Sequence, residues 1–230
     1  LMWLLIFGLI HALLIWYGDI LVTYALTGFL VLLARSWRAR TLLTTGAVLF
    51  ALSVALQSAF GLVFQAIPAS EIAEIEAQVW ALPPEELRRI VAAYQGGIVA
   101  ATTENASTWL EFMVNALIGL ILRTAGVMMI GMGLFKLGFL SGRAPTWLYA
   151  VVAALGVVAL GAIGYQAWIN WRAGFAFVHM QTNGGFANTA LSLFGALGYA
   201  SLIVLLVKGG VSLVAEPLAA VGRMAFTNYI

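Results

Sequence analysis

The sequence contains no cysteine, which excludes disulfides, catalytic thiolates and metal sites built on cysteine. Histidine is scarce too, and the wide separation of His11 and His179 argues against a multi-histidine metal site. Charge is the third shortage, because only 9% of the 230 residues are charged whereas 63% are hydrophobic. A soluble domain carries about 25% charged residues, and so few charges cannot keep a folded surface hydrated. A soluble globular protein is therefore excluded.

Several motifs that would identify an enzyme class are also missing. The chain has no G-x-G-x-x-G or G-x-x-x-x-G-K-[ST] loop, no G-x-S-x-G and no H-E-x-x-H. An ATP-driven pump and an α/β-hydrolase are therefore unsupported. The net charge of +2 is small and the basic residues are scattered, so nucleic acid is not an expected partner. The mean hydropathy of +1.02 indicates an integral membrane protein, whose expected partner is the lipid bilayer.

Long apolar runs predict membrane-spanning helices, because a helix needs about 20 apolar residues to cross the hydrocarbon core. Unbroken runs of Leu, Ala, Val and Ile favour helices over the alternating pattern of barrel strands. We predict one all-α transmembrane domain over residues 1–230, with about six to seven spans. Both ends fall in apolar runs, so we expect the domain to be partial and truncated at both ends. The predicted spans are Trp3–Trp16, Ile20–Ala34, Leu42–Phe64, Leu110–Leu137, Leu148–Ile169, Ala187–Val207 and a seventh beginning near Pro217.

Charges in the connections predict the orientation, since Lys and Arg accumulate on the cytoplasmic side of a membrane. This rule places Arg35–Arg40 and Arg143 in the cytoplasm, and Asp19 and residues 67–108 outside. We expect short amphipathic helices in the extracytoplasmic segment 67–108. One of them should begin at Pro84, with an ion pair between Glu85 and Arg89.

Ionisable side chains inside spans are costly, so each one is a candidate site residue. Arg123 lies in the fourth predicted span, and its guanidinium suits a carboxylate or phosphate. The alternative is a structural ion pair with an acid on a neighbouring helix. At 100° per residue, Arg123 shares one helix face with several polar and small residues. They are Glu104, Thr108, Glu111, Asn115, Gly119, Gly126 and Gly133, and the three glycines recur every seven positions, as expected where another helix packs closely.

Shorter polar stripes occur on three other spans. They indicate either hydrogen bonds between helices or a shared hydrated cavity. The stripes are Asp19, Thr23 and Thr27; Ser53, Gln57, Gly61 and Gln65; and Asn188, Ser192, Gly195 and Tyr199.

His11 and Asp19 form a second candidate site, separated by a short Trp16-Tyr17-Gly18 turn. A carboxylate that orients an imidazole creates a general base of the kind that acyl or proton transfer requires. The alternative is a histidine that only makes a hydrogen bond between helices.

Three stretches together resemble one known family. Residues 7–21 (FGLIHALLIWYGDIL) are similar to its FGLLHALLLW-x-GDIL pattern, residues 129–142 (MIGMGLFKLGFLSG) to LLGMALYRLGFLSG, and residues 217–229 (PLAAVGRMAFTNY) to PLAAVGRMALTNY. The family is the YeiB-like family of bacterial inner-membrane proteins, which has no assigned reaction. The matching positions are His11, Gly18, Asp19, Gly131, Gly138, Gly222, Arg223, Thr227 and Asn228.

The resemblance implies a multi-pass protein of the inner membrane. It also implies a grouping with membrane acyltransferases, which move an acyl group from a cytoplasmic donor, such as acyl-CoA, to an extracytoplasmic acceptor. We therefore expect an acyltransferase-like enzyme in which His11 and Asp19 handle protons. A small-solute or lipid transporter and a non-catalytic scaffold remain as alternatives. The expected substrate-binding residues are Glu111, Asn115, Arg123, Arg223 and Asn228.

Overall fold

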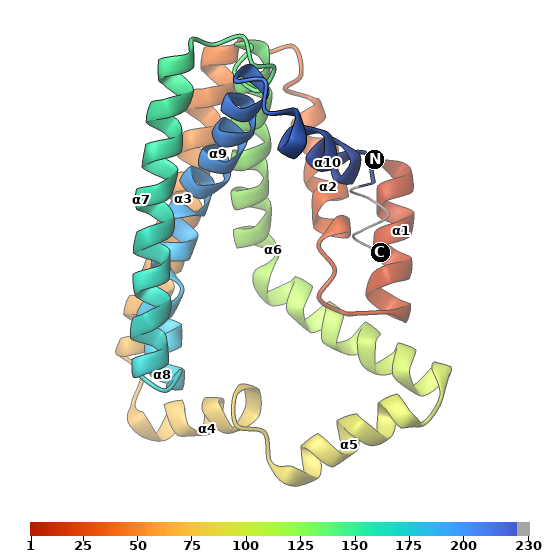
Figure 1. The fold of residues 1–230 in the computed structure, drawn as a ribbon. Coiled ribbons are helices and arrows are strands. Elements are labelled where there is room, and N and C mark those ends of the chain that lie inside the picture. Colours follow the sequence, from red (N-terminus) through yellow and green to blue (C-terminus); the bar gives the residue numbers. More distant parts are fainter. Residues whose placement is uncertain (225–230) are drawn as a thin grey trace.

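The computed structural model describes residues 1–224, apart from the side chains of residues 212–215. The described chain is helical and contains no strand, which confirms the all-α prediction. Figure 1 shows a bundle of long helices beside a hairpin of two short ones. The elements are α1 (Met2–Leu14), α2 (Leu21–Leu32), α3 (Ala39–Gln65), α4 (Ala69–Val79), α5 (Pro84–Gln95), α6 (Ile98–Lys136), α7 (Thr146–Arg172), α8 (Phe177–His179), the π-helix η1 (Met180–Gly184), α9 (Phe186–Lys208) and α10 (Ser212–Arg223).

Among the described residues, the helices α3, α6, α7 and α9 are long and apolar enough to cross a membrane. The helices α1 and α2 are apolar but have only 13 and 12 residues. At 1.5 Å per residue they extend about 20 and 18 Å, less than the ~30 Å hydrocarbon core. They form a hairpin whose turn lies at a level between the two ends of α7 (Figure 1). The predicted spans Trp3–Trp16 and Ile20–Ala34 therefore correspond to two short helices. The seventh predicted span begins inside α10, which has 12 residues and includes Pro217.

Small residues allow the long helices to approach closely, as the glycine pattern predicts for part of α6. A Cβ atom added to Gly126 would lie 2.8 Å from the backbone nitrogen of Phe50 on α3. Likewise, a Cβ added to Gly133 would lie 2.7 Å from the side chain of Leu43. Gly119 differs, because an added Cβ would meet nothing within 4 Å. The heptad of glycines therefore marks close helix packing at two positions and open space at the third.

The helix α6 has 39 residues and changes direction near its middle (Figure 1). Its C-terminal half packs along α3, whereas its N-terminal half runs beneath the α1–α2 hairpin and meets α5. Asn105 connects the N-terminal half of α6 to its neighbours through two hydrogen bonds. Its Nδ2 donates to the carbonyl oxygen of Leu13 at 3.2 Å, and its Oδ1 accepts from the hydroxyl of Tyr94 at 2.7 Å. One side chain thus joins α1, α5 and α6.

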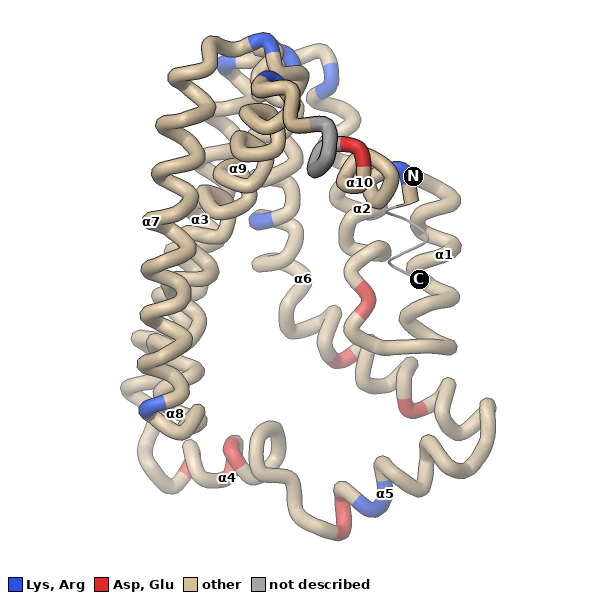
Figure 2. The backbone as a smooth tube through the Cα atoms, viewed as in Figure 1, with Lys and Arg blue, Asp and Glu red and all other residues tan. Residues whose placement is uncertain are grey.

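Figure 2 shows a cluster of basic residues at one end of the bundle and a mixture of acidic and basic residues at the other. Lys and Arg dominate the end where α3 begins and α6 ends, and the acidic residues of α4 and α5 lie at the other end. This distribution fits the predicted orientation, which remains a prediction.

The helix α5 begins at Pro84 as predicted, but its ion pair differs from the expected one. Arg89 binds Glu86 at 2.8 Å and Glu104 of α6 at 2.9 Å, and not Glu85. The reason is that α6 packs against α5 and brings Glu104 within reach of Arg89. The hydrogen bond from Arg89 lowers the pKa of the Glu86 carboxyl, and Glu86 and Glu104 raise the pKa of Arg89.

Candidate functional site

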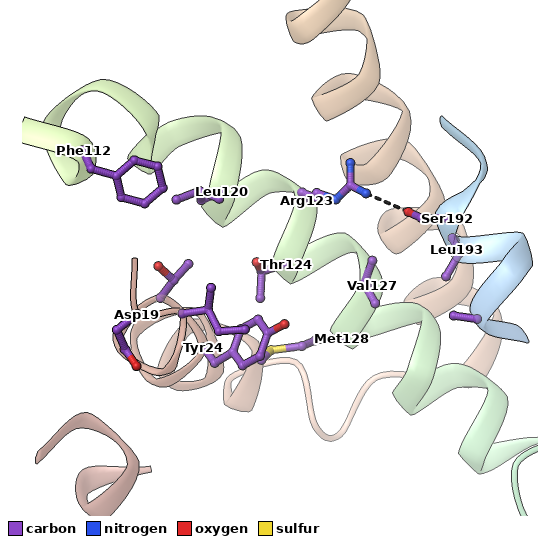
Figure 3. A pocket seen from close by; sticks show the side chains of 13 residues that line it. Asp19, Tyr24, Phe112, Leu120, Arg123, Thr124, Val127, Met128, Ser192 and Leu193 are labelled. Carbon is purple, nitrogen blue, oxygen red and sulfur yellow. Dashed lines mark hydrogen bonds between the residues drawn. The ribbon is translucent and has the colours of Figure 1, made fainter. Parts of the chain in front are cut away.

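A cavity of about 590 Å³ lies between α2, α6 and α9 (Figure 3). The turn before α2 and the face of α2 supply one wall, and α6 and α9 supply the others. Most of the lining is apolar, with a few polar groups, as is usual for small-molecule sites. The lining residues are Asp19, Ile20, Thr23, Tyr24, Phe112, Leu120, Arg123, Thr124, Val127, Met128, Ser192, Leu193 and Ala196.

Arg123 is the cation of this cavity. Its Nη1 donates to the carbonyl oxygen of Thr189 at 3.2 Å, and its Nη2 donates to Oγ of Ser192 at 2.7 Å. Its Cζ lies 5.7 Å from the centre of the Phe50 ring, within cation–π range. These partners are all neutral. In the part of the chain that the structure describes, no Asp or Glu forms an ion pair with Arg123.

His11 and Asp19 meet as the sequence hypothesis requires. Nδ1 of His11 lies 2.8 Å from Oδ2 of Asp19. Oδ1 of Asp19 accepts the backbone N–H of Val22 at 3.1 Å, so the same carboxylate stabilises the start of α2. Gly18 lets the ring of Trp16 lie against the turn between the helices, because a Cβ there would make that ring shift. Asp19 is fully buried and His11 nearly so.

Only one member of this pair lines the cavity. Asp19 stands at one edge and Arg123 stands with Ser192 at the other (Figure 3). His11 lies behind Asp19 and does not line the cavity. Thr23 also lines the cavity; it is buried, and its Oγ1 has no hydrogen-bond partner among the described residues. The cavity therefore combines a cation, a carboxylate and a hydroxyl with available hydrogen-bonding capacity.

A second cavity of about 560 Å³ adjoins the first, between α3, α6 and α9. Leu120 and Arg123 line both cavities. In the second cavity, Oγ1 of Thr189 donates to Oε1 of Gln57 at 2.7 Å. Gly119 belongs to this wall, which accounts for its open surroundings. The remaining lining residues are Ser53, Leu56, Phe60, Asn115, Ala116 and Ile118.

Of the other expected site residues, only Asn115 lines a cavity together with Arg123 among the described residues. Asn115 lines the second cavity, whereas Glu111 is exposed and lines neither. Glu111 is twelve residues from Arg123 on α6, or about 18 Å along a straight helix axis. Arg223 is the exposed last residue of α10 and also lines neither cavity. Asn228 lies outside the described residues.

The sequence analysis did not identify Thr189, whose carbonyl oxygen accepts from Arg123 and whose hydroxyl donates to Gln57. The expected stripe begins at Asn188, which is exposed, whereas Thr189 is buried. The spacing of Thr189, Ser192 and Ala196 at i, i+3 and i+7 is the signal that would have found this face.

Comparison with known proteins gives a consistent result. Residues 134–230 match the family described as "Protein of unknown function (DUF418)". Uncharacterized protein YeiB of Escherichia coli (strain K12) is 28% identical over 245 residues, covering 99% of this chain and 58% of YeiB. Uncharacterized protein YxaH of Bacillus subtilis (strain 168) is 56% identical over 52 residues, covering 23% of this chain and 13% of YxaH. The chain thus spans little more than half the length of YeiB.

No solved structure matches the chain. The DUF418 match includes Thr189, Ser192 and Arg223, whereas Arg123, His11 and Asp19 lie outside it. With the three motifs and the apolar helices, these matches support a YeiB-like family for this chain, which is an integral membrane protein of uncharacterised function.

Proposed function

We propose that this chain forms part of a membrane acyltransferase-like enzyme that moves an acyl group to an extracytoplasmic acceptor. The observation that carries the proposal is Arg123, a cation within a membrane-spanning helix whose described partners are all neutral. A charge in this setting is costly without an opposite charge. An anionic group on the acyl donor, such as a phosphate of acyl-CoA, supplies that opposite charge. The resemblance to the YeiB-like family supports acyl transfer as the chemistry.

In such a transfer, a hydroxyl of the acceptor attacks the carbonyl carbon of a thioester. The new C–O bond replaces the C–S bond, the hydroxyl proton passes to a base, and the departing thiolate takes up a proton. Asp19, on the cavity wall and hydrogen-bonded to His11, is the proposed proton acceptor. The hydrogen bond of 2.8 Å between the two groups holds the carboxylate of Asp19 in a fixed orientation.

The test is donor-dependent stabilisation of the purified chain in phosphatidylcholine nanodiscs, with acetyl-CoA or octanoyl-CoA as the donor. A ligand present at about 100 times its Kd stabilises the folded state by about 2.7 kcal/mol. We expect Arg123→Gln to remove this stabilisation, whereas Arg143→Gln retains it because Arg143 is exposed and lines neither cavity. The proposal fails if neither donor stabilises the wild-type chain, or if Arg123→Gln responds as the wild type does.

Transport of an anionic solute or lipid is the second candidate. The observations that favour it are the two adjoining cavities that share Arg123 and the two helices α1 and α2 that are too short to span the membrane. Short or broken helices are common around transporter binding sites. Uptake into proteoliposomes that depends on Arg123, with no acylated product formed, would replace the enzyme proposal by this one.

A further inference from the structure

We infer that the connection between α2 and α3 is a binding surface for anionic phospholipids of the leaflet on that side of the membrane. This inference is independent of the proposed acyl transfer. The connection lies at the basic end of the bundle (Figure 2). The surface consists of Arg35, Arg38 and Arg40, together with Trp37, and all four residues are exposed.

The positive charges of these arginines have no partner within the described part of the chain. None of the three guanidinium groups forms a hydrogen bond or an ion pair with another described residue. The sequence contains no Asp or Glu between Asp19 and Glu71. Arg38 and Arg40 also flank the first residue of α3, where the positive end of the helix dipole makes a cation unfavourable. Such a surface attracts anions from outside the chain.

Lys136 shows a different use of a cation at the same end of the bundle. Its Nζ donates to the carbonyl oxygen of Arg35 at 2.7 Å and to that of Trp37 at 2.6 Å. These two hydrogen bonds tie the connection to the end of α6. Lys136 therefore holds the backbone of the connection in place, whereas the three arginines supply the charge that the protein itself does not use.

The geometry places these arginines at the surface of the membrane. The helix α3 has 27 residues and is about 40 Å long, which exceeds the ~30 Å hydrocarbon core and approaches the ~40–45 Å of a bilayer with its headgroups. Arg38 and Arg40 therefore lie where α3 enters the headgroup layer. The connection consists of residues 33–38 alone, too few to extend far from the membrane. Trp37 favours the same layer, because tryptophan side chains concentrate at the membrane–water interface.

The chemistry of the surface selects a phospholipid with a net negative charge. A guanidinium group forms two parallel hydrogen bonds with the oxygens of a phosphate. Phosphatidylcholine also offers a phosphate, but its choline group cancels the negative charge. Each Lys or Arg beside an anionic membrane surface strengthens binding about fivefold. Phosphatidylglycerol should therefore gather at this surface in preference to phosphatidylcholine.

The absence of cysteine allows a single fluorophore to be attached at the surface. Ser36→Cys places it between Arg35 and Trp37, and Ser70→Cys places a matched probe on α4 at the other end of the bundle, since both serines are exposed. Quenching of each probe by spin-labelled phosphatidylglycerol, relative to equally labelled phosphatidylcholine, measures the local enrichment in phosphatidylcholine nanodiscs. We expect enrichment of at least about tenfold at Ser36→Cys in 0.1 M NaCl, and none at Ser70→Cys.

Two changes should remove this enrichment at Ser36→Cys. Arg38→Gln/Arg40→Gln should lower it at least about fivefold. Arg88→Gln is the matched control and should leave it unchanged, because Arg88 is exposed on α5 and forms no ion pair among the described residues. Raising NaCl to 1 M should also remove most of it, since the Debye length falls from about 10 Å to about 3 Å.

The inference is overturned if the two lipids quench the probe at Ser36→Cys equally, if Arg38→Gln/Arg40→Gln keeps the enrichment, or if the enrichment persists in 1 M NaCl. The salt result stands for the wild-type surface even if circular dichroism shows that the double variant does not fold. Inorganic phosphate at constant ionic strength should leave the enrichment unchanged. Its loss in phosphate would show that the surface binds a soluble anion, and the lipid assignment would fail.

Discussion

Asp19 has no exposed surface, and its carboxylate serves two neighbours at once. It binds Nδ1 of His11 and accepts the N–H of Val22, so it joins the end of α1 to the start of α2. Such a group combines structural and chemical roles, because a buried carboxylate is stable only while its hydrogen bonds are made. Replacing Asp19 should therefore lower the stability of the folded chain, whatever its effect on a reaction.

We expect Asp19→Ala to lower the free energy of unfolding by about 2–4 kcal/mol, through the loss of a charge-assisted hydrogen bond and a helix cap. Asp19→Asn should cost less, since its amide oxygen can still accept from Val22. Thr27→Val is the control, because the buried Oγ1 of Thr27 has no partner among the described residues and its removal should be neutral or stabilising. Unfolding in an SDS titration, followed by circular dichroism, measures all three. A neutral Asp19→Ala would refute the structural role.

For the helices, the sequence predicts the type of each element better than the residues at which it begins and ends. The helix α6 begins at Ile98, twelve residues before the predicted span at Leu110. Polar residues such as Thr102, Glu104 and Asn105 interrupt the apolar pattern without breaking the helix, since helix continuity depends on backbone hydrogen bonds. The glycine heptad shows a similar limit. The seven-residue period indicates that the glycines lie on one face of α6. Which of them contact another helix depends on where α6 changes direction.

Gly126→Leu tests the close contact between α3 and α6. The added Cβ would lie 2.8 Å from N of Phe50 and 2.9 Å from O of Gly46, and both atoms belong to backbone that cannot move aside. We expect a loss of about 3 kcal/mol of stability from this overpacking. Gly131→Leu, with open space around it, should lose little and can gain helix propensity. Equal stability of the two variants in the SDS titration would contradict the packing described above.

For the molecule as a whole, composition and charge were sufficient to predict an all-α membrane protein. The His11–Asp19 pair also follows from the sequence, because a short turn returns the chain beside itself. The partners of Arg123 do not follow, since Thr189 and Ser192 lie 66 and 69 residues away and come near it because α6 and α9 both contact α3. Periodicity along one helix carries no information about the rotation of its neighbour.

The absence of cysteine makes the orientation directly testable. We introduce one exposed cysteine at each end of the bundle, as Gln78→Cys in α4 and Ser141→Cys after α6. A membrane-impermeant maleimide should label Gln78→Cys in intact spheroplasts, and Ser141→Cys only after permeabilisation, because basic connections remain in the cytoplasm. The reverse labelling pattern would invert the orientation and place α4 and α5 inside the cell.

The side chain of Asn105 connects α5 to α1. Its Oδ1 accepts a hydrogen bond from the hydroxyl of Tyr94 on α5, and its Nδ2 donates to the carbonyl oxygen of Leu13 on α1. Leu13 is two residues from His11, so this one side chain ties α5 to the last turn of α1, the turn that contains His11. A change at Asn105 should therefore disturb the His11–Asp19 hydrogen bond as well as the contact between α5 and α6.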